Sequence, residues 1–334
     1  MTFTSENTRA LLLLTAPLIV GDTDDVTIKI LSLSETNKLA RRLKEMGVEP
    51  LDLLGTARAE LLDKLSSLIS SERLENLLDR GFQMSQALEK WSGRGIWITS
   101  RTDTDYPLRL KSKLKEQAPT LIYGCGDKTL LQNGGLAVVG SRKADEQSLN
   151  FTNSVGQLAA AAGVTIISGG ARGVDRAAME ACLNSGGKAI GVLAEQLFRL
   201  AVAPDCREWV REGRLTLVSL VDPAAGFNVG NAMQRNKVIY ALGEAGLVVS
   251  SDVNKGGTWA GAIEQLERFK GCPVYVLTSN DTPDGNRELQ SRGAIAWPQP
   301  ETADELKLAL TSSQAESEAF TAGPDLPLFA MEEH

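Results

Sequence analysis

The sequence predicts an α/β fold, and three observations carry this prediction. From residue 135 to about residue 298, short apolar runs alternate with stretches of helical spacing. Short apolar strands separated by helices are typical of a parallel sheet that is covered on both faces. Two of the runs end in glycine-rich bends, and the first 92 residues have helical spacing instead. We therefore expect an extended Rossmann-like parallel sheet with helices on both faces, preceded by a small helical domain.

The helical N-terminal domain is predicted to span residues 1–92. Its apolar residues recur at three- and four-residue spacing, as Leu39 and Leu43 do, which is the pattern of helices with one buried face. Ser34 offers a helix N-cap and Gly47 a helix stop. These signals predict several short helices that pack around a common apolar core.

The apolar run Ala10–Val20 within this domain is predicted as a core helix. It has about half of the roughly 20 residues that a membrane span needs, and Pro17 interrupts it. A basic leader and a small-residue cleavage site do not accompany the run, so we do not expect a signal peptide. The sequence therefore predicts no membrane partner.

A connector with short strands is predicted for residues 93–134. Ile96–Thr99 and Pro119–Tyr123 have the apolar character of short strands, and Asp105–Pro107 has the composition of a turn. We expect this segment to link the helical domain to the sheet.

The Rossmann-like domain is predicted to span residues 135–300. Its strands and helices are expected to alternate, since each apolar run is followed by a helical pattern. The expected strands are Leu136–Val139, Val164–Ser168, Ala189–Leu193, Leu215–Ser219, Gly246–Ser250 and Val274–Thr278. The expected helices are Glu146–Ala161, Val174–Asn184, Ala232–Leu242 and Trp259–Lys270.

Residues 301–334 are predicted to hold one C-terminal helix and then an acidic, disordered tail, because apolar density falls after residue 311. Within the tail, Leu326, Leu328 and Phe329 resemble the short peptides that dock into the bacterial sliding clamp. Pro327 restricts the peptide to an extended form, which lowers the ordering cost of binding. Two alternatives stay open, namely that these residues fold back onto the protein and that they have no partner.

The composition excludes several classes of protein. The net charge of −7 argues against a protein that coats nucleic acid with its whole surface, although it allows a local basic pocket. The single histidine, His334, excludes histidine-dependent catalysis, and the four cysteines have no C-x-x-C spacing that would indicate a metal site. We expect no catalytic residues, no metal, no cofactor and a reducing cytoplasm.

Glycine-rich bends at the ends of two strands predict an anion site. Glycines allow a tight turn and leave room for a phosphate beside the amides of a helix N-terminus. Parallel strands end at one edge of the sheet, where open α/β folds bind ligands. Neither a dinucleotide fingerprint nor a Walker A loop is present. The first two predicted loops contain Gly140, Ser141 and Arg142, and Ser168, Gly169, Gly170, Arg172 and Gly173.

Two further segments are predicted to reach the same edge. One contains Arg235 and Asn236, and the other contains Lys255, Gly256, Gly257 and Thr258. A helix start favours an anion through its dipole, and guanidinium groups bind phosphate oxygens in pairs.

Each of these segments has a structural alternative. The glycine pairs are also what plain strand-to-helix turns use, Arg142 is also a typical surface charge, and Arg235 is also able to pair with a carboxylate inside the fold. Asp175 is interpreted as a residue at a helix start that orients Arg172 or loop amides. Trp259 is interpreted as a packing residue, with base stacking as the alternative.

These segments, taken in order, resemble the DprA/Smf family of DNA-processing proteins. The similarity covers roughly residues 100 to 280. It rests on Val139–Arg142, Ser168–Asp175, Arg235–Leu242 and Lys255–Ala262, with Asp105–Pro107 and Pro119–Tyr123 upstream.

The resemblance implies a protein that binds single-stranded DNA, forms a homodimer and works with a RecA-type recombinase in recombination, DNA uptake or DNA defence. It places the first DNA-contacting loop at Gly140, Ser141 and Arg142, and the second at Ser168, Gly169, Arg172 and Gly173. Arg235, Asn236 and Lys255 complete the pocket that it implies. Candidate dimer surfaces are the strand Val274–Leu277 and the segment Gln196–Val202.

Two other functions remain open. A nucleotide-sensing protein in a defence or signalling pathway would use the same strand ends. A phosphoribohydrolase would need the spacing P-G-G-x-G-T-x-x-E, which Lys255–Glu264 does not have.

Overall fold

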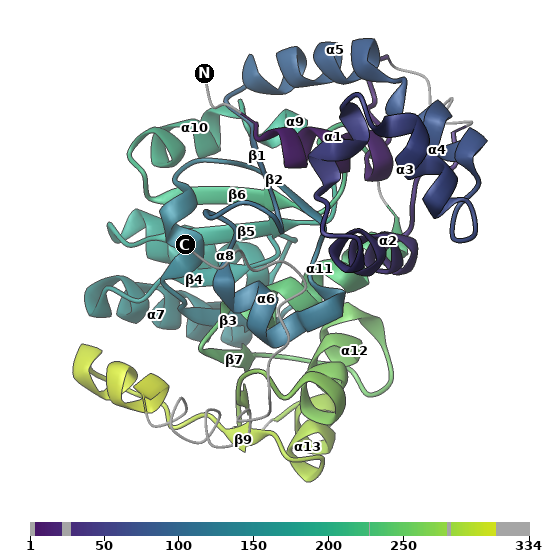
Figure 1. The fold of residues 1–334 in the computed structure, drawn as a ribbon. Coiled ribbons are helices and arrows are strands. Elements are labelled where there is room, and N and C mark those ends of the chain that lie inside the picture. Colours follow the sequence, from purple (N-terminus) through teal and green to yellow (C-terminus); the bar gives the residue numbers. More distant parts are fainter. Residues whose placement is uncertain (1–3, 22–27, 227, 279–281, 312–334) are drawn as a thin grey trace.

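A nine-stranded mixed sheet organises the part of the chain that the structure describes (Figure 1). This computed structural model describes residues 4–21, 28–226, 228–278 and 282–311. The strand order is β1-β2-β6-β5-β4-β3-β7-β8-β9. The strands are β1 Trp97–Ser100, β2 Leu121–Cys125, β3 Leu136–Val139, β4 Ile166–Ser168, β5 Ala189–Leu193, β6 Leu215–Ser219, β7 Ala245–Val248, β8 Val274–Val276 and β9 Ile295–Ala296.

The helices include five in the N-terminal region and a second set between the strands. The first set is α1 Glu6–Thr15, α2 Leu33–Glu45, α3 Arg58–Leu65, α4 Ser71–Leu78 and α5 Gly81–Ser92. The second is α6 Leu108–Leu114, α7 Glu146–Ala162, α8 Val174–Asn184, α9 Leu197–Leu200, α10 Pro204–Arg211, α11 Val229–Leu242, α12 Gly256–Glu264 and α13 Asp284–Ser291. Short 3-10 helices are η1 Pro50–Leu54, η2 Lys115–Gln117 and η3 Lys128–Gln132, and the π-helical turn η4 Gln265–Phe269 follows α12. Residues 303–311 are helical as well.

The predicted α/β fold with helices on both faces is confirmed, and the sheet is parallel from β6 to β9. It is mixed rather than wholly parallel, because β1 and β2 come from the segment predicted as a connector and join the edge in antiparallel pairing. The two strands are not joined by a tight turn, because α6 and η2 lie between them in the chain.

Side chains alternate between two apolar cores, one on each face of the sheet. In β3, Leu136 and Val138 belong to the core that includes α7 and α8, while Ala137 and Val139 belong to the core that includes α6, α11 and α12. Burial on both faces explains why β3 is apolar throughout, without the polar alternation of a half-exposed strand.

The N-terminal helices continue the first of these cores. Leu11–Leu14 of α1 are buried, which confirms a core helix, but α1 ends at Thr15 and residues 16–20 of the predicted run are not helical. The rings of Trp91 and Tyr123 meet edge to face at 5.2 Å. Figure 1 shows α1–α5 gathered at the end of the sheet that β1 and β2 form. Because this core is continuous, the domain boundary predicted at residue 92 remains a prediction.

Several local predictions need correction. The helix predicted at Trp259–Lys270 begins earlier, as α12, and its last residues form the π-helical turn η4. The helix α11 begins at Val229 rather than Ala232, and β4 begins at Ile166 rather than Val164. The N-cap of α2 is Ser32 rather than Ser34, and it forms a capping box with Glu35. β7 begins one residue earlier and ends two residues earlier than predicted. The strand Val274–Leu277, predicted as a candidate dimer edge, contains β8, which lies between β7 and β9 and is not an edge strand.

Within the described ranges, the helices are all too short or too polar to cross a membrane. The predicted clamp-binding residues Leu326, Leu328 and Phe329 lie outside the described residues.

Candidate nucleic-acid interface

The loops after β3 and β4 meet at one edge of the sheet. β3 and β4 are neighbouring parallel strands, so both loops leave from the same side. The backbone amide of Val174 donates to the carbonyl oxygen of Ser141 over 3.3 Å. Gly173 has a φ of +82°, and a Cβ there would lie 2.3 Å from that same oxygen. A residue with a side chain would therefore push the two loops apart.

The start of α12 joins the first loop from the other side. The hydroxyl of Thr258 donates to the carbonyl oxygen of Gly140 over 3.0 Å, and the amide of Ser141 donates to the hydroxyl of Ser250 over 3.2 Å. β7 pairs with β3, so its following loop reaches the same edge. We call Gly140–Arg142, Gly169–Gly173 and Lys255–Thr258 together the loop edge.

A buried ion pair lies beneath the loop edge. Nη1 of Arg235, on α11, lies 3.3 Å from Oδ2 of Asp175, on α8, and each side chain is 8% exposed. A Cβ on Gly169 would lie 1.0 Å from that Nη1 atom, so the guanidinium packs directly against the glycine backbone. A residue larger than glycine therefore does not fit at position 169 while Arg235 is paired with Asp175.

Asp175 ties the pair to the loops. Burial raises the pKa of its carboxyl, while Arg235 and hydrogen bonds from the backbone amides of Gly140 and Gly169 act in the opposite direction. The interpretation that Asp175 orients loop amides is therefore confirmed. Its alternative partner is wrong, because the arginine that it holds is Arg235 and not Arg172.

Three cations of the loop edge are exposed, namely Arg142, Arg172 and Lys255. Among the described residues, none of the three side chains has a hydrogen bond or an ion pair with another part of the chain. Surface ion pairs contribute little stability, so a single exposed cation without a partner is common. Three such cations on three loops that meet at one edge concentrate positive charge there.

The remaining predicted residues form the support of these loops. Ser168 is buried and its hydroxyl donates to the carbonyl oxygen of Val138 over 2.6 Å. Asn236 is buried and donates to the carbonyl oxygen of Gly257 over 2.8 Å. The structure thus brings them to the loop edge, where their hydrogen bonds are made within the protein. Their contact with phosphate remains a prediction.

Trp259 is a packing residue, as its interpretation expected. It is 6% exposed in the core beneath α12, and the guanidinium of Arg292 lies 5.6 Å from its ring. The alternative, stacking on a base, is wrong for this arrangement. Sequence inspection also missed Ser250, whose hydroxyl holds the first loop and which no local motif marks.

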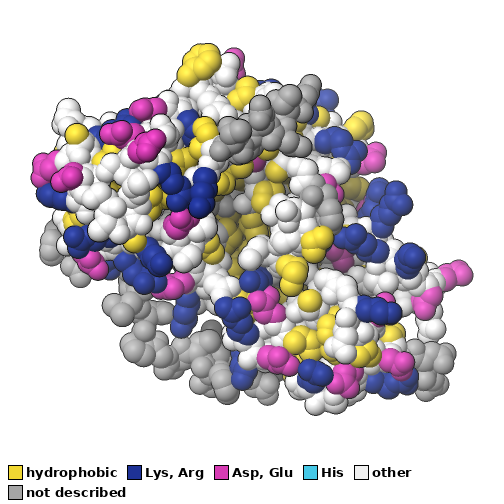
Figure 2. Space-filling view, turned by 90° about the vertical axis from the view of Figure 1, so that its right-hand side faces the viewer, with side chains coloured by type: hydrophobic (Ala, Val, Ile, Leu, Met, Phe, Trp, Pro, Cys, Tyr) yellow, Lys and Arg dark blue, Asp and Glu magenta, His cyan; other side chains and the backbone are white. Residues whose placement is uncertain are grey.

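Figure 2 shows the side of the molecule on which α2, α11 and α12 lie in Figure 1. A hollow with hydrophobic side chains at its floor crosses this face, and Lys and Arg side chains gather around it. Asp and Glu side chains lie among them on the same face (Figure 2). In the described part of the chain, no three His, Cys, Asp or Glu side chains are grouped to hold a metal ion.

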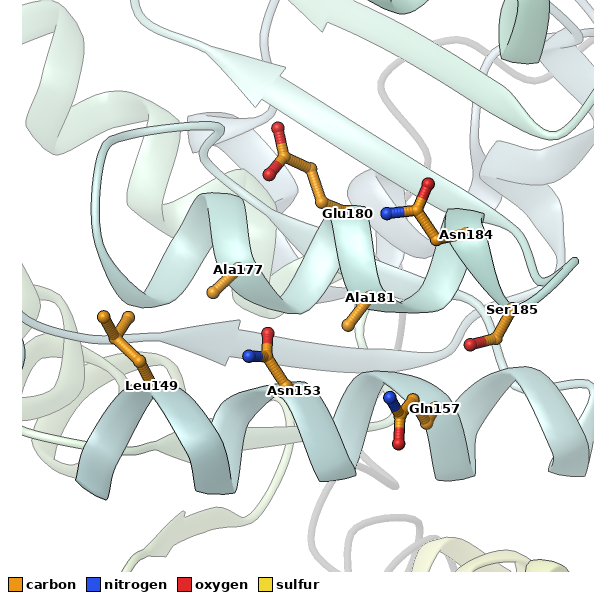
Figure 3. Close-up of a pocket in the computed structure, with 8 residues that line it drawn as sticks. All are labelled: Leu149, Asn153, Gln157, Ala177, Glu180, Ala181, Asn184 and Ser185. Atoms are coloured by element: carbon orange, nitrogen blue, oxygen red, sulfur yellow. The ribbon is translucent and has the colours of Figure 1, made fainter. Parts of the chain in front are cut away.

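A different groove lies between α7 and α8 and shares no residue with the loop edge (Figure 3). Amide and small side chains from the two helices face each other across it, including Asn153, Gln157 and Asn184. The charged residue of its lining, Glu180, is paired with Arg176 over 2.6 Å. The described residues that line this groove include no cation, so it does not suit an anion.

Comparison with models of protein families assigns the chain to a family. The model of the family described as DNA recombination-mediator protein A matches residues 97–305, from β1 to the C-terminal helix. The chain belongs to this family. The match includes the two antiparallel strands, so the segment predicted as a connector is part of the family's common fold. It also includes every residue of the loop edge.

Curated relatives agree with this assignment. DNA processing protein DprA of Streptococcus pneumoniae is 31% identical over 238 residues, which is 70% of this chain and 82% of that protein. Protein Smf of Synechocystis is 30% identical over 176 residues, 51% of this chain. The matched region spans 44% of the Synechocystis protein's own length.

Solved structures share the fold. DprA of S. pneumoniae has a TM-score of 0.67 at 19% identity, covering 91% of this chain and 98% of that one. DNA processing protein A of Helicobacter pylori, in a structure that concerns its single-stranded DNA binding mode, has a TM-score of 0.52 at 22% identity. That match covers 65% of this chain and 96% of the H. pylori chain.

Proposed function

We propose that this member of the DNA-processing family binds single-stranded DNA at the loop edge and catalyses no reaction on it. The observation that carries the proposal is the set of three exposed cations, Arg142, Arg172 and Lys255, on three loops that meet beside glycine backbone. Backbone amides and arginines are the groups that proteins use to hold phosphates. The structure that describes single-stranded DNA binding by the H. pylori relative supports the same ligand.

Exposed apolar side chains near the loop edge favour an unpaired strand. Val229 and Met233 on the first turns of α11 are 67% and 46% exposed, and Val253, two residues before Lys255, is 37% exposed. Apolar groups gain nothing beside the phosphates of a duplex, whereas the faces of unpaired bases offer apolar contact. An apolar surface next to exposed cations therefore suits single-stranded DNA.

The carboxylate that holds the loops together argues for binding rather than catalysis. Asp175 is buried and shared between Arg235 and two loop amides. A general acid or base must reach the proton that it transfers, within about 3 Å. Asp175 instead fixes the geometry of the loops.

Two partners are proposed from the family alone. A RecA-type recombinase is expected to bind the protein when both are mixed with single-stranded DNA, and co-sedimentation with the recombinase filament measures this. A homodimer is expected in sedimentation, and a monomer at about 10⁻⁵ M protein would contradict it. Of the two predicted dimer surfaces, the segment Gln196–Val202 stays a candidate, because the side chain of Val202 in it is 45% exposed.

The sliding clamp remains a proposed partner of the C-terminal tail. A peptide covering residues 323–332 should bind the clamp with a Kd on the order of 10⁻⁶ M, and Leu328→Ala with Phe329→Ala should abolish binding. If the substituted peptide binds the clamp as tightly as the unaltered peptide, the clamp is not a specific partner of the tail.

A binding titration tests the proposed function against its alternative, a small-nucleotide sensor. An oligothymidylate and thymidine monophosphate are titrated at two salt concentrations. A site that contacts several phosphates loses affinity steeply with salt, with a slope of log K against log salt of about −0.7 per phosphate on single strands. Tight binding of the mononucleotide with weak binding of the oligonucleotide would favour the sensor instead.

A further inference from the structure

A second groove, of about 230 Å³, lies between the N-terminal helices and the sheet region. It runs between α2 and η2, two elements that lie apart from the loops after β3 and β4. This volume is below the usual range for a whole small-molecule ligand, roughly 300–1,000 Å³, and suits a single compact group. Its lining consists of Leu33, Ser34, Asn37, Lys38, Arg41, Glu116 and Gln117.

The charges along this α2–η2 groove are mainly positive. Lys38 and Arg41 are exposed on one face of α2. The one lining carboxylate, Glu116, accepts from Nη2 of Arg41 over 2.5 Å, so one cation is paired. Within the described chain, the ammonium group of Lys38 has no hydrogen bond or ion pair. A free cation thus stands at the rim.

A buried arginine behind the groove forms no ion pair with a carboxylate among the described residues, although the charge of Glu116 acts on it. Arg101 is 5% exposed, and its Nη2 donates to Oδ1 of Asn37 over 2.6 Å and more weakly to the hydroxyl of Thr120 over 3.4 Å. Its Nε atom is buried without a hydrogen-bond partner. Buried charges are normally compensated by an opposite charge or a bound ion, because desolvation is costly. Here the guanidinium is directed at Asn37, which forms the wall of the groove.

The start of α2 adds two backbone donors. Leu33 and Ser34 are the first residues of this 13-residue helix and both line the groove. The amides of the first helical residues have no acceptor within the helix. The capping box of Ser32 and Glu35 uses the backbone amide of Glu35 and does not use the amides of Leu33 and Ser34.

We propose that the α2–η2 groove is a second phosphate-binding subsite, in which Lys38 and the first amides of α2 hold one phosphate group and the buried charge of Arg101, behind Asn37, favours an anion there. The phosphate belongs either to the backbone of a strand that continues from the loop edge or to a free nucleotide or phosphate ion. The helix α11 has residues at both places. Lys237, two residues after Arg235, donates to the Gln117 side chain over 3.1 Å at the groove.

The test uses charge reversal at the exposed rim residue, with the full-length protein. Lys38→Glu is compared with Lys188→Glu, which makes the same change of net charge at the amino end of β5, on the opposite edge of the sheet. Inorganic phosphate is titrated by calorimetry in an Arg142→Ala, Arg172→Ala, Lys255→Ala background, so that the three exposed cations of the loop edge are removed. Oligothymidylates of increasing length are titrated in the unaltered background at several salt concentrations.

Either source of phosphate gives a distinct result. If the strand continues into the groove, Lys38→Glu weakens binding of long but not short oligothymidylates and lowers the salt slope by about 0.7. If a free phosphate binds, Lys38→Glu weakens inorganic phosphate by about tenfold or more and leaves the oligonucleotides unchanged. The second result is independent of the proposed function and stands even if no oligonucleotide binds.

Two outcomes overturn the proposal. If Lys38→Glu binds every probe as tightly as Lys188→Glu does, the groove is not a phosphate-binding site. Arg101→Met, which keeps the side-chain volume and removes the charge, is expected to weaken phosphate binding as Lys38→Glu does. A folded Arg101→Met variant with unchanged phosphate binding contradicts the role of the buried charge. If Arg101→Met does not fold, the comparison of Lys38→Glu with Lys188→Glu alone tests whether the groove binds phosphate.

Discussion

Replacing Gly169 by alanine is the sharpest test of how the loop edge is built. The added Cβ would lie 1.0 Å from Nη1 of Arg235, 2.3 Å from its Cζ and 2.7 Å from Oδ2 of Asp175. No rotation of a methyl group relieves such contacts, so the guanidinium must leave Asp175. The backbone at Gly169 does not itself require glycine, because its φ is not among the positive values.

The size of the effect follows from breaking a buried ion pair. Removing one partner of such a pair typically costs about 3–5 kcal/mol, because the other charge stays buried without compensation. Asp175 keeps its two amide hydrogen bonds, and burial already favours its neutral form. We therefore expect the low end, a loss of about 3 kcal/mol in the free energy of unfolding.

A double-mutant cycle in urea measures this directly. In an Arg235→Ala background the space occupied by the guanidinium is free and the 2.7 Å contact with Oδ2 of Asp175 remains, so Gly169→Ala should cost less there, about 1 kcal/mol. Gly170→Ala is the matched control. Its φ is +64° and its nearest neighbour, Cδ2 of Leu193, would lie 3.3 Å away, so its strain of about 1–2 kcal/mol should be equal in both backgrounds. An equal cost of Gly169→Ala in both backgrounds would refute the reasoning.

Three further substitutions have calculable effects. Gly173→Ala should cost about 3 kcal/mol in unfolding experiments, because its φ of +82° and the 2.3 Å approach to the Ser141 oxygen both disfavour a side chain. Thr258→Val removes the hydroxyl that donates to the carbonyl group after β3, and should cost about 1 kcal/mol. Arg73 and the helix N-cap lower the pKa of Glu35 from 4.5 to about 2, so its stabilising contribution is present above pH 4.5 and is lost as pH falls towards 2. Glu35→Gln should flatten the pH dependence of stability in that window, and an unchanged profile would contradict the assignment.

Elements with a strong apolar pattern could be predicted from the sequence. β3, β5, β6 and α8 begin and end where the pattern placed them, because each is buried along its length or along one face. The elements α10 and β9 escaped prediction. The helix α10 has three apolar residues on the face that packs against the core, Cys206, Trp209 and Val210, but none is fully buried and the helix has only eight residues. Both residues of β9 are exposed, so this strand has no apolar pattern.

The residues of the candidate site divide in the same way. Glycines and cations next to strand ends are local signals, and they identified the loop edge. The pairing of Arg235 with Asp175 joins residues 60 positions apart and depends on how α11 packs against α8, so no local pattern contains it. The sequence therefore located the site but did not separate its exposed cations from its buried support.

The salt dependence of single-stranded DNA binding by Arg142→Ala and Arg172→Ala tests the central claim most directly. Both residues are exposed, so the variants should fold like the unaltered protein, and Lys188→Ala serves as the control at the opposite edge. Affinities for one oligothymidylate are measured by fluorescence anisotropy over a range of salt concentrations. We predict weaker binding by each variant and a salt slope reduced by about 0.7 for each phosphate that the variant no longer neutralises. Affinities and slopes equal to those of the Lys188→Ala control would contradict the assignment of the loop edge as the DNA-binding site.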